Sequence, residues 1–523
     1  MDFIEERASG PRPWLVILFC VIYAFAGLTG HDPWKTDDAL HLGIAHGFFT
    51  TNDWRIPALA GEPVPEAEPL YHWVAASTAG LTQSVLPFHD GARLASALFI
   101  VAFLLAIGGA SRRLYGVEAG WGAPLLAIGT LGLLVPLHEA QPASAILACS
   151  AIVYWGVAML GKQPLAGAIV AGCGIATAFL AGGLGASLPL IALLLLPLSQ
   201  GRWASVLVAM IVGTMVAAIW PLALFYQAPD FLNAWWASEK LTLAGHDGFS
   251  LIHLQWLSWF GWPVLYIALW TLWSDRRQFL TPALTLPLLG LVLALTWFLF
   301  HEARLPAMLP LVTPMILLAT SGSARLRRGA ANAWDWFGMM TVSIVAAFIW
   351  LGTTAIYLGW PAKLARNIAR LAPGFAGQLW LPTIFVALAA TLLWLAMLLN
   401  LPRSPWRVAT RWGAGVTVVW TLLVVLWLPW IDYGKTYRPV VASLRRALPE
   451  DSGCIGRSNL GLGQRAVLDY FAGIRTRSNA ERCRWLIGQF SSPDATDPVG
   501  WNRVWESRRP GDRTEIWRLY RKA

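Results

Sequence analysis

The chain has 523 residues, of which 56% are hydrophobic and only 13% charged, and it carries 31 tryptophans and a formal net charge of +10. Together with a mean hydropathy of +0.54, this composition excludes an ordinary soluble protein. Apolar runs long enough to cross a bilayer recur from Trp14 to about Trp430, and backbone in lipid must bond within its own segment, so the sequence predicts a polytopic α-helical membrane protein.

The apolar runs predict about thirteen transmembrane helices. They begin near Trp14, Arg93, Ala119, Pro142, Leu165, Leu184, Trp203, Gln255, Phe279, Leu305, Trp334, Trp380 and Gly413. The first run lacks a convincing small-residue cleavage site, so we expect it to be retained as a helix. We expect residues 1–431 to form the transmembrane domain.

Basic residues fall in alternate short loops, which predicts the orientation in the membrane. These residues are Arg112, Arg113, Lys162, Arg202, Arg276, Arg277, Arg325, Arg327, Arg328, Arg403, Arg407 and Arg411. The positive-inside rule then places the N-terminus in the cytoplasm, and an odd number of spans places the C-terminus outside.

A polar insert, residues 31–73, follows the first span and is expected on the external side. Carboxylates this close to lipid are expensive, so Asp37 and Asp38 raise the prior for function. Alternatively, Thr36 caps a helix whose acidic first turn suits the helix dipole. Both interpretations stand at this point.

Residues within the insert have helical spacing. Leu40, Ile44 and Phe48 recur four apart and predict an apolar stripe lying in the membrane interface. Asp37 and His41 are also four apart, so both side chains are expected on one helical face. The stripe would therefore orient that face relative to the membrane.

Two later loops carry further polar groups. In residues 226–254, Trp235 and Trp236 are typical of an interfacial aromatic belt, and His246 beside Asp247 is a candidate for a divalent metal, although such a pair is short of a complete site. Arg304 opens a helix interrupted by prolines, and its guanidinium suits bidentate contact with a lipid phosphate.

The polar tail, residues 432–523, is long enough for a soluble domain. Its patterns alternate between helix-like and strand-like and predict a small α/β unit: helices at 440–448, 464–472 and 501–508, and strands at 453–456, 484–489 and 513–519. Cys454 and Cys483 are its only cysteines, and an oxidising compartment would allow them to pair or remain free. A net charge of about +7 in the tail favours anionic lipid over nucleic acid as a partner.

Four segments, taken together, carry a resemblance. Asp37-Asp38-Ala39-Leu40-His41, Asp53-Trp54-Arg55-Ile56-Pro57 and Glu68-Pro69-Leu70-Tyr71-His72-Trp73 resemble the first external loop of the aminoarabinose lipid A transferase family. Pro229-Asp230-Phe231 with Glu239, and Arg304-Leu305-Pro306, resemble its later loops. That family belongs to the GT-C glycosyltransferases, which include the protein O-mannosyltransferases.

The resemblance implies an inverting glycosyltransferase at the periplasmic face of the bacterial inner membrane, moving a sugar from a polyprenyl-phosphate carrier to a lipid, glycan or protein acceptor. It assigns Asp37 as the catalytic carboxylate. The expected substrate and carrier contacts are Lys35, Asp38, Arg55, Glu68, Tyr71, Glu239, Lys240 and Arg304. A departing phosphate monoester is a good leaving group, so the reaction needs one base and cations rather than a general acid. No cofactor is certain, and a divalent metal stays open.

Several positions depart from the family pattern. Leu40 and Leu243 stand where basic residues are common, Ala67-Glu68 replaces a Glu-Lys step, and Ala181-Gly182 replaces a lysine-glycine step. The sugar and the acceptor are therefore not assigned. A lipid-linked sugar flippase, which would need charged or broken helices at mid-bilayer depth, and a noncatalytic membrane scaffold are the alternatives.

Overall fold

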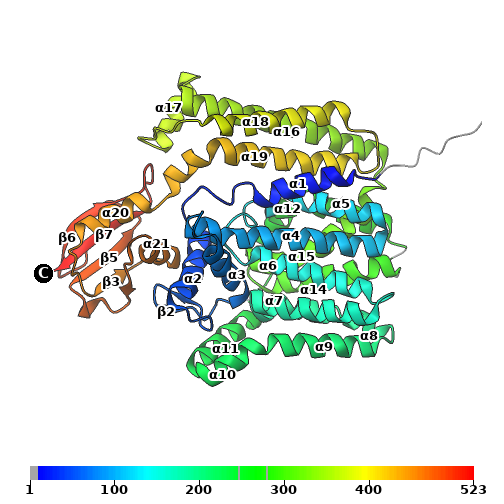
Figure 1. Cartoon of the computed structure of the whole chain (residues 1–523), viewed down its shortest axis with the longest axis horizontal. Coiled ribbons are helices and arrows are strands. Elements are labelled where there is room, and N and C mark those ends of the chain that lie inside the picture. The colour runs from blue at the N-terminus through cyan, green and yellow to red at the C-terminus, as the bar shows by residue number, and fades with distance from the viewer. Residues whose placement is uncertain (1–9, 246–247, 278, 280) are drawn as a thin grey trace, which may run out of the picture.

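Long apolar helices form most of the molecule, and short helices and a C-terminal sheet cover one end of the bundle (Figure 1). The computed structural model describes residues 10–245, 248–277, 279 and 281–523. Within them, eight elements are long and apolar enough to cross a membrane, and four shorter apolar helices accompany these. The protein therefore has the polytopic helical fold predicted from its composition.

The bundle helices run in chain order with short connections. They are α1 (Pro13–Phe25), α4 (Phe88–Tyr115), α5 (Val117–Ile128), α6 (Ala143–Met159), α7 (Pro164–Ala192), α8 (Leu195–Ser199), α9 (Trp203–Ala217), α10 (Ile219–Gln227), α12 (Leu251–Phe260), α13 (Val264–Ser274), α14 (Pro282–Phe300), α15 (Leu305–Ser323), α16 (Arg328–Leu358), α18 (Leu381–Asn400) and α19 (Arg407–Lys435).

Helix α7 contains a reversal. Gly182 and Gly183 have non-helical backbone angles, and the φ of +61° at Gly183 is one that glycine adopts without steric cost. Lys162, before α7, and Arg202, after α8, line the same cavity, so the two arms of this segment run antiparallel. They correspond to the separate spans predicted near Leu165 and Leu184.

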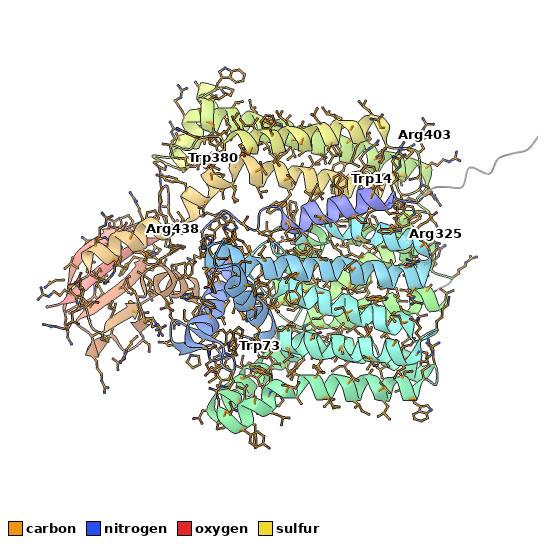
Figure 2. All side chains as sticks on the ribbon, viewed as in Figure 1. Trp14, Trp73, Arg325, Trp380, Arg403 and Arg438 are labelled. Carbon is orange, nitrogen blue, oxygen red and sulfur yellow. A yellow bond between two sulfur atoms is a disulfide. The ribbon has the colours of Figure 1, made fainter. Side chains whose placement is uncertain are left out.

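The two ends of the bundle differ in chemistry. Figure 2 shows Trp73 and Arg438 at one end and Arg325 and Arg403 at the other. We call the first the loop end, because it carries the insert and the C-terminal domain. We call the other the arginine end, because it collects the basic residues of the alternate short loops.

The insert folds into two helices and a short hairpin at the loop end. These are α2 (Asp37–Thr51), β1 (Ala58–Leu59), β2 (Glu62–Pro63) and α3 (Pro69–Thr82), and the other short helices at this end are α11 (Pro229–Ala244) and α17 (Ala362–Leu371). The predicted lipid-facing stripe of α2 was wrong, because Ile44 and Phe48 are 0% and 1% exposed. They are buried because α2 lies between α3 and the C-terminal helix α21 (Leu462–Ala472), and Gly43 admits α21 closely.

The C-terminal domain is a mixed five-stranded sheet in the order β4-β3-β5-β7-β6, with helices α20 (Arg438–Ala447) and α21. Its strands are β3 (Ile455–Ser458), β4 (Thr476–Arg477), β5 (Trp485–Phe490), β6 (Trp501–Ser507) and β7 (Ile516–Lys522). The helix predicted over 501–508 was wrong, since this segment is the edge strand β6, paired antiparallel with β7. Short 3₁₀ turns lie at Leu131–Leu133 and Ala480–Arg482.

The C-terminal domain is fastened to the insert by ion pairs. Glu62 pairs with Arg457 at 2.7 Å and with Arg465 at 2.6 Å, and Lys35 pairs with Glu515 at 3.3 Å. Helix α19 runs unbroken through the boundary expected between residues 431 and 432. The domain therefore braces the insert.

Cys454 and Cys483 form a disulfide with a Cα–Cα distance of 4.9 Å. Replacing both with serine is expected to lower the free energy of unfolding of this domain by about 3 to 4 kcal/mol, because the bridge closes a long loop of the unfolded chain. Thermal unfolding of the serine variant, followed by tryptophan fluorescence, measures the loss. Replacing Cys20, outside the disulfide, with serine controls for loss of a thiol, and equal effects of the two changes would contradict the prediction.

Candidate active site

Asp37 is the first residue of α2 and is exposed at the loop end. Thr36 occupies the N-cap position, but its side chain makes no capping hydrogen bond to the helix backbone. Partial burial raises the pKa of Asp37, a hydrogen bond with Thr36 opposes this, and the charge of Asp38 adds to it. A carboxylate that is accessible and more basic than usual is suited to accept a proton.

Asp38, the next residue, has a different environment. It is 1% exposed and forms an ion pair of 2.7 Å with the fully buried Arg93. Its carboxylate also accepts the backbone N–H groups of Trp34 and Ala140. Burial opposes ionisation of Asp38, but the Arg93 guanidinium outweighs it and holds the pKa at about 2. These bonds saturate Asp38, so its role in this geometry is to position the loop.

Glu139 is a carboxylate that the sequence analysis missed. It lies in the connection between α5 and α6, where Gln141 donates a hydrogen bond of 3.0 Å to its carboxylate. Burial raises its pKa to about 8, the charges of Asp38 and Asp37 add to the rise, and Lys435 opposes it. Glu139 and Lys435 are therefore close enough to Asp37 to share its electrostatic environment. The available signal was a glutamate between two apolar spans on the predicted external side.

A cavity of about 490 Å³ lies beside the start of α2. Three cations line it: Lys35, Lys435 and Arg509. Lys35 and Arg509 pair with Glu515, whereas the Lys435 ammonium lies 4.7 Å from the centre of the Trp34 ring and has no carboxylate partner within the described residues. The cavity is therefore suited to a phosphate, and Lys435 is its least neutralised cation.

A second polar group surrounds the turn after the hairpin. His41 contacts His72 at 3.0 Å between ring nitrogens, and His72 bonds the backbone carbonyl of Glu68. Burial, together with the charge of Glu239, raises the pKa of Glu68 to about 8. Glu239 accepts the N–H of Leu184 at 2.7 Å, which ties α11 to the reversal in α7.

Tyr71 is completely buried, and its hydroxyl hydrogen-bonds Ser96 at 2.8 Å. This contact holds α3 against α4. The hydroxyl therefore already has a partner inside the protein, and a role of Tyr71 in carrier binding stays a prediction.

The remaining predicted cations have local partners. Arg55 pairs with Asp53 at 2.7 Å, Lys240 lies 5.7 Å from the Trp236 ring centre, and the 70% exposed Arg304 pairs with Glu302 at 2.8 Å. In the part of the chain that the structure describes, no hydrogen bond or ion pair joins any of these cations to Asp37. Their roles in phosphate binding stay predictions.

His246, the candidate metal ligand, lies outside the described residues. Over residues 10–245, 248–277, 279 and 281–523, no group of three histidine, cysteine, aspartate or glutamate side chains is arranged to hold a metal ion.

The pKa of Glu139 predicts a pH dependence of stability. Because the folded state raises this pKa from 4.5 to about 8, ionisation opposes folding, and the free energy of unfolding is expected to fall as the pH rises through this interval. Glu139→Gln keeps the side chain neutral and should flatten the decline, measured as melting temperatures from pH 5 to 8. Glu66→Gln, at an exposed carboxylate, is the control. An unchanged slope in Glu139→Gln would contradict the assignment.

Comparison with known proteins gives two kinds of likeness. No family model matches the chain. Over 330 residues it is 25% identical to the undecaprenyl phosphate-α-4-amino-4-deoxy-L-arabinose arabinosyl transferase of Serratia proteamaculans, a match that covers 58% of this chain. The chain spans 57% of that relative's length.

The structure superimposes on two crystal structures of ArnT from Cupriavidus metallidurans. The TM-score is 0.68 with the form bound to undecaprenyl phosphate and 0.69 with the apo form, at 15% and 17% identity and with 97% of each chain covered. The chain therefore has the ArnT fold, as the GT-C resemblance predicted.

Proposed function

We propose that the protein is a GT-C glycosyltransferase that moves a sugar from a polyprenyl-phosphate carrier to an acceptor at the loop end. The observation that carries the proposal is the exposed carboxylate of Asp37, directly after Trp34, Lys35 and Thr36 in a cavity with three cations. The positive-inside rule assigns the loop end to the periplasmic side of a bacterial inner membrane.

The chemistry follows from these groups. Asp37 accepts the proton of an acceptor hydroxyl, whose oxygen attacks the anomeric carbon of the sugar from the face opposite the phosphate. The bond between the anomeric carbon and the phosphate oxygen breaks, and the carrier leaves as a phosphate monoester with inversion at the sugar. Lys435, Lys35 and Arg509 stabilise the charge on that phosphate. When the acceptor atom is an ionised phosphate oxygen, Asp37 orients it instead.

The donor class has independent support. The Serratia relative is named as an undecaprenyl-phosphate-dependent transferase, and one matched ArnT structure holds undecaprenyl phosphate. The proposal takes the polyprenyl phosphate from these proteins but not the sugar, since Leu40 and Glu68 depart from the family pattern beside the site. A flippase is less well supported, because these polar groups gather at one end rather than at mid-membrane depth.

Lys435→Gln is expected to raise the KM for the donor about tenfold to a hundredfold with little change in kcat, because a lost charge-assisted hydrogen bond to phosphate weakens ground-state and transition-state binding alike. Steady-state kinetics with a polyprenyl-phosphate sugar measure the change. Lys363→Gln, which removes an exposed lysine from α17, is the matched control. Equal KM values in the two variants would exclude Lys435 from the phosphate site.

A photo-crosslink tests the location of the carrier. A polyprenyl phosphate with a diazirine next to its phosphate should label peptides containing residues 34–37 or 434–435. Competition by unlabelled carrier establishes specificity. Labelling confined to the arginine end would overturn the proposed function.

A further inference from the structure

The largest cavity described lies far from Asp37. It has a volume of about 890 Å³ and opens among α4, α6, the two arms of α7 and α8, and α14 at the arginine end. Helix α4 begins near the insert and reaches this cavity at Arg112 and Arg113, its last turn. Its 28 residues span about 42 Å at the helical rise, so the cavity is separate from the candidate active site.

Four cations from three parts of the chain meet at this cavity. Arg112 and Arg113 end α4, Lys162 precedes α7, and Arg202 follows α8. Arg113 donates a hydrogen bond of 2.9 Å to the Gln163 side chain. Across the described ranges, none of the four cations pairs with a carboxylate. Gathering four positive charges around one space is unfavourable unless an anion neutralises them.

The rest of the cavity lining is apolar. Trp155, Leu196 and Leu286 contribute to it, together with Leu114 and Val157. Cations at the helix ends therefore adjoin an apolar wall within the bundle. A free inorganic anion would contact the cations and leave the apolar wall bare. An amphipathic anion would use both parts of the cavity.

We propose that this cavity binds an acidic glycerophospholipid from the leaflet at the arginine end. Its phosphate lies among Arg112, Lys162 and Arg202, and an acyl chain follows the wall formed by Trp155 and Leu286. Basic pockets between transmembrane helices are suited to such headgroups. The bound lipid neutralises the cations and joins α4, α7 and α14. This proposal does not depend on the proposed function.

Native mass spectrometry after extraction from nanodiscs tests the site. The nanodiscs contain equal amounts of phosphatidylglycerol and phosphatidylcholine. The wild-type protein is expected to retain phosphatidylglycerol selectively, and the triple variant Arg112→Gln/Lys162→Gln/Arg202→Gln to lose at least tenfold of that adduct. The matched control, Arg327→Gln/Arg328→Gln/Arg403→Gln, removes three exposed arginines that do not line the cavity and should retain the lipid.

Competition distinguishes the possible sources of phosphate. Inorganic phosphate at 10 mM should leave the wild-type adduct intact, because it cannot use the apolar wall. Displacement by inorganic phosphate would identify a free-anion site, and preferential displacement by polyprenyl phosphate would identify a carrier site; either result overturns the lipid proposal. Equal loss of lipid in the control variant also overturns it.

A second measurement uses the wild-type protein alone, so it does not depend on folding of the variants. Adding phosphatidylglycerol to protein in detergent should raise the melting temperature by several degrees relative to phosphatidylcholine, since a ligand that binds only the folded state stabilises it. Identical melting temperatures with the two lipids would overturn the proposal.

Discussion

Asp37→Asn is expected to lower the rate of sugar transfer by about 100-fold to 10,000-fold, because the amide cannot accept the proton of the acceptor hydroxyl. The exchange preserves the size of the side chain, and Asp37 is exposed, so the melting temperature should stay close to that of the wild type. Turnover by the purified protein with a polyprenyl-phosphate sugar and a cell-envelope acceptor fraction measures the effect.

Two controls make this prediction specific. Asp53→Asn changes another exposed aspartate of the same insert, whose partner is Arg55, and should leave turnover within a few-fold of the wild type. Donor binding by Asp37→Asn, measured with the photo-crosslink, should persist because the cations remain. Near-normal turnover would refute Asp37 as the base and return the noncatalytic scaffold to consideration.

The pH dependence of turnover gives an independent check. Catalysis by Asp37 needs its ionised form, so kcat/KM should fall as the pH drops below the pKa of this carboxyl. Because burial raises that pKa, the acid limb should lie above the ordinary aspartate value of 3.8. The limb should disappear from the residual activity of Asp37→Asn.

Asp38→Ala is expected to lower the free energy of unfolding by about 3 to 5 kcal/mol, because it leaves the buried Arg93 guanidinium without its carboxylate. The change also removes the acceptor for the backbone N–H of Ala140, 2.8 Å away. Thermal or denaturant unfolding in detergent measures the loss. Asp38 should therefore differ from Asp37 in kind, with loss of folding rather than loss of chemistry.

A double variant tests whether the buried pair is the cause. Asp38→Leu combined with Arg93→Met should recover much of the stability lost in either single variant, since apolar groups of similar size replace buried ion pairs at little cost. The control is Arg55→Gln, which breaks an exposed pair worth under about 1 kcal/mol. Additive losses in the double variant would contradict the assignment.

The pKa of Asp38 also sets a pH window for this stabilisation. The folded-state pKa of about 2 lies below the ordinary value of 3.8, so the contribution is complete above about pH 4 and is lost as the pH falls towards 2. Asp38→Ala should remove that acid-dependent part of the unfolding curve.

The insert shows how far sequence reasoning reached within the site. The pattern identified α2, the shared face of Asp37 and His41, and Asp37 ahead of Asp38. It did not reveal that α21 covers α2, so the stripe expected to face lipid is buried in protein. Glu139 and Lys435 were missed because each is one ordinary charged residue at the end of an apolar segment.

The C-terminal domain shows the same limit. Its helices α20 and α21 and the strands β3, β5 and β7 follow local patterns that the sequence analysis found. Residues 501–508 have no such clear pattern, and pairing with β7 makes a strand of residues 501–507. Edge strands depend on a partner elsewhere in the chain, so local preference decides them weakly.

The sequence by itself determined that this is a helical membrane protein with a polar insert after its first span and a soluble tail. It could do so because the bilayer imposes a local rule: each apolar segment must be long enough and must satisfy its own backbone. Only the tertiary structure decided which charges are buried and which remain available. Asp32 and Asp432, 400 residues apart, meet at 2.9 Å, and no local pattern encodes a pairing at that separation. Desolvation and neighbouring charges, which depend on such long-range contacts, separate the chemistry of Asp37 from the packing role of Asp38.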